Sequence, residues 1–265
     1  MNAPLARVFI FALVIYVLTF LVTTILHEVA HAVTSLALGG RPVLHHVYVA
    51  HEGLEGARQA MVSAAGPLMS LVQGGVLLAL LRATSAAPTA TRLALVWLCI
   101  HGLVNFFGYL VTTPFVPNAD LGKIASWLEL PMLARWGVFA AGLGAITWIG
   151  FWAREPLLAF VVEPAALTDP AARVRHVMAI GVGPWLLGGA LIALASWPSP
   201  HWISFLYPFF AGFFLFVTVR RARDILPPDV GAPLWTDGAL WPWLVGVAAV
   251  LVIFRVLVGG VRLGG

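Results

Sequence analysis

Charged side chains are scarce in this chain of 265 residues: Asp, Glu, Lys and Arg make up 10% of it, and hydrophobic residues make up 61%. Soluble domains carry nearer a quarter charged residues. A water-soluble globule is therefore excluded, because so few charges cannot cover its surface. Intrinsic disorder is excluded too, because disordered chains combine low hydrophobicity with high charge. The class that remains is a polytopic membrane protein, which is embedded in the lipid bilayer.

Lysine and cysteine are nearly absent, with Lys123 and Cys99 as the sole examples. A single cysteine excludes an intramolecular disulfide. The net charge of +4 comes almost entirely from scattered arginines. Because no polar domain accompanies them to form a binding face, we expect no nucleic-acid partner. A chain rich in Ala, Gly and Arg is typical of a high-GC bacterium, so we expect the bacterial inner membrane.

Long apolar runs without charge recur along the chain. Most of them reach or approach the roughly 20 residues that a membrane-spanning helix needs. The last two are short or are interrupted by Pro208 and Pro242. We therefore predict an all-α polytopic membrane protein with six to seven transmembrane helices. The runs cover residues 8–26, 60–81, 93–111, 136–153, 177–197, 202–219 and 239–254.

Two connecting segments differ from ordinary loops. Residues 42–48 (PVLHHVY) are rich in β-branched and aromatic residues, which predicts a short membrane-associated strand or hairpin near residues 42–51. Residues 113–122 (TPFVPNADLG) form a loop broken by prolines at membrane depth. Irregular backbone is tolerated there only where it is buried in protein or lines a cavity.

The sharpest motif is His27-Glu28-Val29-Ala30-His31, at the end of the first apolar run. Residues four apart share one face of a helix, so both imidazoles can bind one metal ion. Zinc suits such a pair, and a catalytic zinc keeps a water that a neighbouring glutamate can deprotonate. Charged groups at membrane depth are costly unless they are paired or functional. The sequence therefore predicts a metal site with Glu28 as general base.

Most other acidic residues lie in loops beside arginines, where solvation explains them. Asp120 differs, because it lies in the proline-broken segment directly after an apolar run. The ordered set of His27–His31, then Ala65-Gly66-Pro67-Leu68, then Pro114-x-x-Pro117-x-x-Asp120-x-Gly122 resembles the site-2 protease family of intramembrane zinc metalloproteases (the M50 class). The resemblance covers roughly residues 19–123.

The resemblance implies a core of three transmembrane helices in residues 1–130, with further transmembrane helices of unnamed role in residues 131–265. It implies one Zn²⁺ per chain, held by His27, His31 and Asp120, with Glu28 activating water. The implied activity is hydrolysis of peptide bonds within or near transmembrane segments of a membrane-protein or peptide substrate, as in regulated intramembrane proteolysis.

The chain departs from the family pattern at the residue expected to stabilise the oxyanion. Thr112 stands where the family has an asparagine, and Leu121 separates Asp120 from Gly122. Asn105 and Asn118 are candidates for the missing amide. His101, four residues before Asn105, shares its face and either supports the site or holds helices together.

Hydrolysis requires an extended substrate backbone, because a helix hides its carbonyl groups in hydrogen bonds. We expect the strand near residues 43–49 to offer an edge for pairing, through Val43, Val47 and Val49. Two alternatives remain open at this point: a catalytically silent, zinc-binding pseudoprotease, and a transporter that uses intramembrane His, Glu and Asp.

Overall fold

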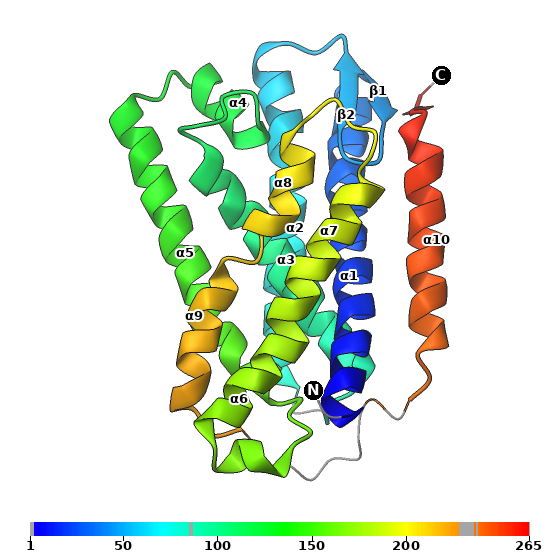
Figure 1. Ribbon diagram of the computed structural model, residues 1–265. Coiled ribbons are helices and arrows are strands. Elements are labelled where there is room, and N and C mark those ends of the chain that lie inside the picture. Colours follow the sequence, from blue (N-terminus) through cyan, green and yellow to red (C-terminus); the bar gives the residue numbers. More distant parts are fainter. Residues whose placement is uncertain (1–2, 85–86, 228–235, 237, 265) are drawn as a thin grey trace.

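Helices dominate the protein, and seven helical segments of the described residues are long and apolar enough to cross a membrane. This confirms the expected all-α polytopic architecture and indicates an integral multi-pass membrane protein. The computed structural model describes residues 3–84, 87–227, 236 and 238–264. The chain begins and ends at opposite ends of the bundle (Figure 1), as an odd number of crossings requires.

The spanning segments are built from the following helices. Two spans are broken: a π-helical turn, Met178–Val182, joins α6 to α7, and α8 gives way to α9 after Pro208. The short helix α4 lies between the third and fourth spans. The bounds are α1 Ala3–Ala37, α2 Gly56–Ala83, α3 Ala90–Thr112, α4 Asp120–Trp127, α5 Met132–Leu158, α6 Pro170–Val177, α7 Gly183–Ala195, α8 Ile203–Phe210, α9 Phe214–Arg221 and α10 Trp241–Val258.

Helix α1 is the helix around which the others pack. It contacts α2, α3, α7 and α10, while α5 packs against α3 on the far side (Figure 1). Its core-facing side chains, such as Ile15 and Leu21, are fully buried. The later helices therefore pack directly on the first three, and they support the helix that carries the histidine motif.

Helices α2 and α3 approach closely through two glycines. A Cβ atom at Gly74 would lie 2.7 Å from the backbone nitrogen of Leu103, and one at Gly102 would lie 2.6 Å from the carbonyl oxygen of Ser70. Both distances are too short for a side chain. Small residues of this kind allow the backbone contact that stabilises helix pairs in lipid.

A three-stranded antiparallel sheet covers one end of the bundle. Strands β1 (Arg41–Leu44) and β2 (Val49–Glu52) form the predicted hairpin, and β3 (Val261–Arg262) from the end of the chain pairs with the other side of β1. Leu44 packs with Ala32 of α1 and Leu257 of α10. The hairpin is thus attached both to α1 and to the C-terminal segment.

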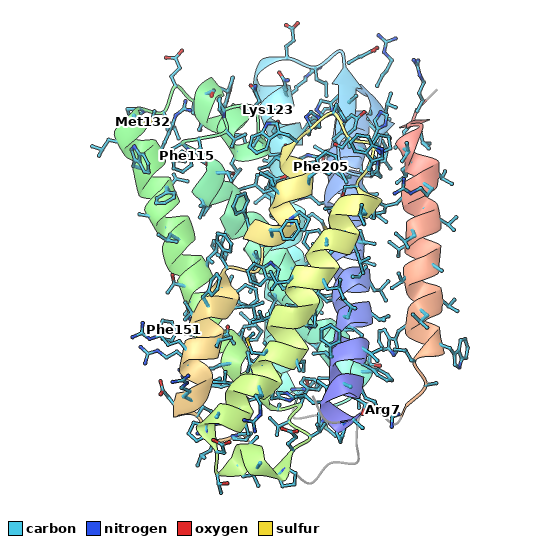
Figure 2. All side chains as sticks on the ribbon, in the orientation of Figure 1. Arg7, Phe115, Lys123, Met132, Phe151 and Phe205 are labelled. Atoms are coloured by element: carbon cyan, nitrogen blue, oxygen red, sulfur yellow. The ribbon has the colours of Figure 1, made fainter. Side chains whose placement is uncertain are left out.

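Apolar side chains also cover much of the outer surface, as a lipid-facing protein requires. Val72 and Val76 of α2 are 58% and 62% exposed. Charged groups lie at the two ends of the bundle: Lys123 is at the end with the sheet, and Arg7 is at the opposite end (Figure 2).

Candidate metal centre

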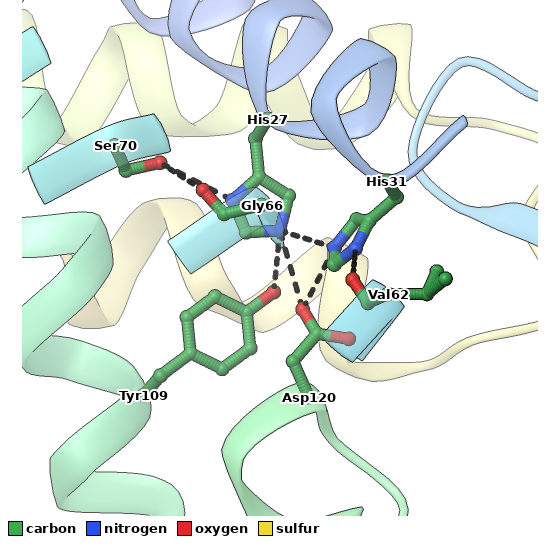
Figure 3. Close-up of polar contacts among 7 residues, drawn as sticks. All are labelled: His27, His31, Val62, Gly66, Ser70, Tyr109 and Asp120. Carbon is green, nitrogen blue, oxygen red and sulfur yellow. Dashed lines mark hydrogen bonds and ion pairs between the residues drawn. The ribbon is translucent and has the colours of Figure 1, made fainter. Parts of the chain in front are cut away.

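The two histidines of the motif lie one turn apart on α1, and their imidazole rings converge on one point. The Nε2 atoms of His27 and His31 are 3.1 Å apart. Oδ2 of Asp120 lies 3.2 Å from each of them (Figure 3). Three ligand-type atoms from two distant parts of the chain thus form a nearly equilateral triangle.

The outer nitrogen of each imidazole is held by α2. Nδ1 of His31 donates a hydrogen bond to the carbonyl oxygen of Val62, at 2.6 Å. Nδ1 of His27 lies 3.2 Å from Oγ of Ser70, whose hydroxyl donates to the carbonyl oxygen of Gly66. Since the Ser70 proton is used there, its oxygen accepts from Nδ1 of His27. Both Nε2 atoms are therefore left with lone pairs directed toward Asp120.

Gly66 gives α2 the room to make these contacts. A Cβ atom at this position would overlap Nε2 of His31 and would come within 2.6 Å of Nε2 of His27. Any side chain at residue 66 would push the imidazole rings away from each other or from α2. Gly66 therefore lets the second helix approach the first.

Asp120 lies in a helix and not in the loop that the sequence predicts. The segment 113–122 was predicted to be a proline-broken loop, but its last three residues are helical, and Asp120 is the first residue of α4. Gly122 makes the fold possible, because a Cβ atom there would overlap the carbonyl oxygen of Val116. The turn before α4 therefore packs against the helix and fixes the position of the carboxylate.

Charge on the neighbouring histidines favours the ionised carboxylate of Asp120. Burial alone would raise the pKa of Asp120, but the imidazoles of His31 and His27, which are positively charged when both ring nitrogens are protonated, hold this pKa well below its usual range. Once the Nε2 protons are released, the carboxylate and the two imidazole lone pairs around one point form a buried group that could hold a metal ion.

Glu28, the predicted base, is also buried, with 7% of its surface exposed. It follows His27 on α1, beside the three candidate ligands. Within the part of the chain that the structure describes, no hydrogen bond or ion pair involves its carboxylate. An acidic side chain that is largely buried beside three candidate ligands is a candidate functional group in a membrane protein.

No hydrogen bond or ring contact joins the three predicted support residues to the ligand triangle in the described structure. His101 is enclosed by aromatic rings, 4.8 Å from Tyr16 and 5.2 Å from Phe20 between ring centroids. Asn105, one turn further along α3, is buried and its Oδ1 has no partner among the described residues. Asn118 is exposed in the turn before α4.

The predicted substrate edge needs correction at two of its three residues. Val43 lies in β1, whose two edges are already paired with β2 and β3, so it offers no free edge. Val47 lies in the turn between the strands, and its side chain packs against the helical core. Val49 lies in β2, which is an edge strand. The residue types of segment 42–48 predicted a strand, but they could not show that β3, more than 200 residues later in the chain, pairs with the second edge of β1.

The free edge of β2 is defined by the hairpin register. The backbone nitrogen of His45 donates to the carbonyl oxygen of Tyr48, and Val43 pairs with Ala50. Because inward and outward bonding alternate along an antiparallel strand, the backbone groups of Val49 and His51 point away from β1. Burial and the nearby ammonium of Lys123 lower the pKa of His51.

A cavity of about 350 Å³ lies between α2 and the α4 region, and none of the three ligand residues is among its lining residues. Its wall includes Ser63, adjacent to the Val62 carbonyl that holds His31, and Lys123, one turn after Asp120. Gln59 and Asn118 add polar groups to the wall. Asn118 therefore lines this cavity and is not part of the ligand cluster.

Sequence reasoning missed three residues that hydrogen-bond the histidines: Val62 and Ser70 of α2, described above, and Tyr109 of α3. The hydroxyl of Tyr109 lies 3.3 Å from Nε2 of His27 (Figure 3). A signal for Tyr109 was present, because His101, Asn105 and Tyr109 are spaced four apart and therefore follow one face of α3. Extending the noted His101–Asn105 pair by one turn would have reached it.

Comparisons with known proteins leave this arrangement without a named relative. No family model, curated protein or solved structure matches the chain.

Proposed function

We propose that this protein is an intramembrane zinc metalloprotease of the site-2 protease type. The observation that carries the proposal is the buried triangle of His27 Nε2, His31 Nε2 and Asp120 Oδ2, next to Glu28 on a membrane-spanning helix. The order of the three motifs along the chain, and their resemblance to that family, support the same assignment.

The dimensions of the triangle are compatible with zinc. Ligands that lie about 2.0–2.1 Å from a tetrahedral zinc stand about 3.3 Å from one another. The three ligand atoms are 3.1–3.2 Å apart. Three protein ligands also leave a fourth position open, as catalytic zinc sites require, whereas structural sites use all four.

Bound zinc would lower the pKa of a coordinated water to about 7 and so supply the nucleophile at neutral pH. Glu28 accepts a proton from the attacking water, whose oxygen bonds to the carbonyl carbon of the scissile peptide. The carbon–nitrogen bond then breaks, and Glu28 passes its proton to the departing amine. One water is consumed per peptide bond, and neither an oxidant nor a reductant is needed.

The position of the site points to substrates that lie in the membrane. His31 lies about 9 Å along the helix axis before the end of α1, at the rise of 1.5 Å per residue. A substrate helix that unwinds near this end of the bundle would pair its extended backbone with the free edge of β2, through the outward groups of Val49 and His51. The cavity beside Lys123 gives water and the cleaved segment a path to the aqueous side.

The proposal is tested by comparing membranes from cells that express the wild type or Glu28→Gln. New peptide termini are mapped by terminal labelling and mass spectrometry. We expect termini within or near transmembrane segments of host or co-expressed membrane proteins with the wild type and none with Glu28→Gln. Glu155→Gln, which changes an exposed carboxylate on α5, is the matched control and should cleave normally.

Two results would overturn the proposal. Identical sets of termini from the wild type and Glu28→Gln would mean that the chain does not hydrolyse these bonds, as for a silent pseudoprotease. Movement of an ion or solute across vesicles that depends on Glu28, without any new termini, would favour a transporter.

A further inference from the structure

Tyr109 contributes a hydroxyl group to the centre of the site. Its ring stacks on the imidazole of His27, with centroids 5.4 Å apart and planes 6° from parallel. Its hydroxyl lies 3.3 Å from Nε2 of His27 (Figure 3). The other nitrogen of this imidazole contacts Ser70. The hydroxyl therefore lies on the side of the ring that faces the metal position.

The residues otherwise available for this part of the site do not reach it. Among the described residues, no hydrogen bond or ring contact joins Asn105, Asn118 or His101 to the three ligands. Asn105 lies one turn deeper along α3, and Asn118 is exposed on the wall of the cavity. Tyr109 is thus the one α3 side chain in the described structure that hydrogen-bonds a ligand of the triangle.

A phenol in this position acts as a hydrogen-bond donor. The carboxylates of Asp120 and Glu28 already supply negative charge here, which disfavours a phenolate as a fourth metal ligand. A neutral hydroxyl can rotate its proton toward any acceptor that enters the open position. A donor that is aimed at developing charge in a water-poor site is worth far more than the same bond in water.

We propose that Tyr109 is a catalytic residue that donates a hydrogen bond to the scissile carbonyl oxygen as negative charge develops on it. The inference rests on the proposed function and assigns the oxyanion role that the sequence left open between two asparagines. Removing one such donor lowers kcat by about 10²–10³-fold in other hydrolases.

Tyr109→Phe tests the assignment because it keeps the ring that stacks on His27 and removes the hydroxyl alone. Tyr207→Phe is the matched control: Tyr207 packs against Phe20, and no hydrogen bond between it and the ligand triangle is found in the described structure. Both variants are purified with their metal, and three quantities are measured: metal content, turnover of a membrane substrate identified by terminal mapping, and affinity for a peptide hydroxamate. The hydroxamate binds the metal and places an acceptor oxygen beside it.

We expect Tyr109→Phe to retain its metal, to lower kcat about 100-fold with little change in KM, and to weaken hydroxamate binding about 10-fold. Tyr207→Phe should match the wild type in all three.

Unchanged turnover by Tyr109→Phe would overturn the inference, and loss of the metal would show that Tyr109 is a ligand instead. If the wild type cleaves nothing, the proposed function fails by itself. Hydroxamate affinity then decides the role of Tyr109. If the wild type and Tyr109→Phe bind the hydroxamate equally well, or if neither binds it, Tyr109 is not a hydrogen-bond donor at this site.

Discussion

Gly66 and His31 lie so close that a single added carbon on Gly66 would overlap the metal-facing nitrogen of His31. The helix-forming preference of the two residue types favours alanine over glycine by about 1 kcal/mol. We nevertheless expect Gly66→Ala to lower the metal affinity of the purified protein by at least about tenfold, as do other changes that reorient metal-bound histidines. Gly75→Ala is the matched control, because a Cβ there meets no atom within 4 Å. Equal metal affinity in the two variants would show that the close contact does not position the imidazoles.

The free edge of β2 leads to a second prediction. Val49→Pro removes a backbone N–H that points away from β1 and leaves the hydrogen bonds of the hairpin in place. We expect cleavage to fall about 2- to 10-fold, since one backbone hydrogen bond contributes about 0.5–1.5 kcal/mol. Metal content should stay unchanged, and Val49→Ala, which shortens the same side chain, should cleave faster than Val49→Pro. Equal rates for these two variants would mean that substrates do not pair with β2.

The C-terminal strand supports the hairpin from the other side. The backbone nitrogen of Leu263 donates to the carbonyl oxygen of Pro42 at 3.1 Å, and its side chain packs beside Leu44. Leu263→Pro removes the donor, while Leu263→Ala keeps it. We expect hydrogen exchange in peptides that cover β1 to be about 2- to 10-fold faster in Leu263→Pro than in Leu263→Ala. The same exchange rate in both would show that β3 does not stabilise the hairpin.

His46 makes the attachment of the hairpin sensitive to pH. Its Nε2 donates to the carbonyl oxygen of Ser196 at 2.9 Å, at the end of α7. Burial lowers the pKa of His46 below its usual value, the bond to Ser196 offsets part of this shift, and the charges of Arg255 and His45 add to it. The folded protein therefore binds this proton less readily than the unfolded chain. The contribution of neutral His46 to the stability of the fold is therefore complete above about pH 6.5 and is lost as the pH falls below that value.

Thermal unfolding in detergent at pH 7.5 and pH 5.0 tests this effect. We expect the melting temperature to fall more for the wild type than for His46→Gln, whose amide can still donate to Ser196 but does not titrate. Protonation of the metal ligands affects both proteins alike, so the difference isolates His46. Equal falls in melting temperature would remove His46 as a pH-sensitive contact.

The membrane class and the histidine pair could be predicted from the sequence because each depends on local pattern. Apolar runs report lipid exposure directly, and residues four apart on a helix share a face wherever the helix lies. The hairpin was likewise predicted from its residue types. These features need no knowledge of which segments meet in space.

Other parts of the site depend on contacts between distant segments. The strand β3 covers β1 although residues 44 and 261 are far apart in the chain, so Val43 was wrongly expected to lie on a free edge. The turn before the helix that begins at Asp120 packs closely against Gly122, where a Cβ atom would overlap the carbonyl oxygen of Val116. Tyr109 belongs to the site through its position beside His27, and tyrosine is too common in apolar helices to reveal such a role alone.

The metal content of the purified protein tests the central claim most directly. The protein is extracted in detergent without chelators, and zinc is measured by mass spectrometry in the wild type, Glu28→Gln and Asp120→Ala. We expect one zinc per chain in the wild type and in Glu28→Gln, because Glu28 is not a ligand, and almost none in Asp120→Ala. A wild type that holds no metal, even after addition of zinc, would contradict the account.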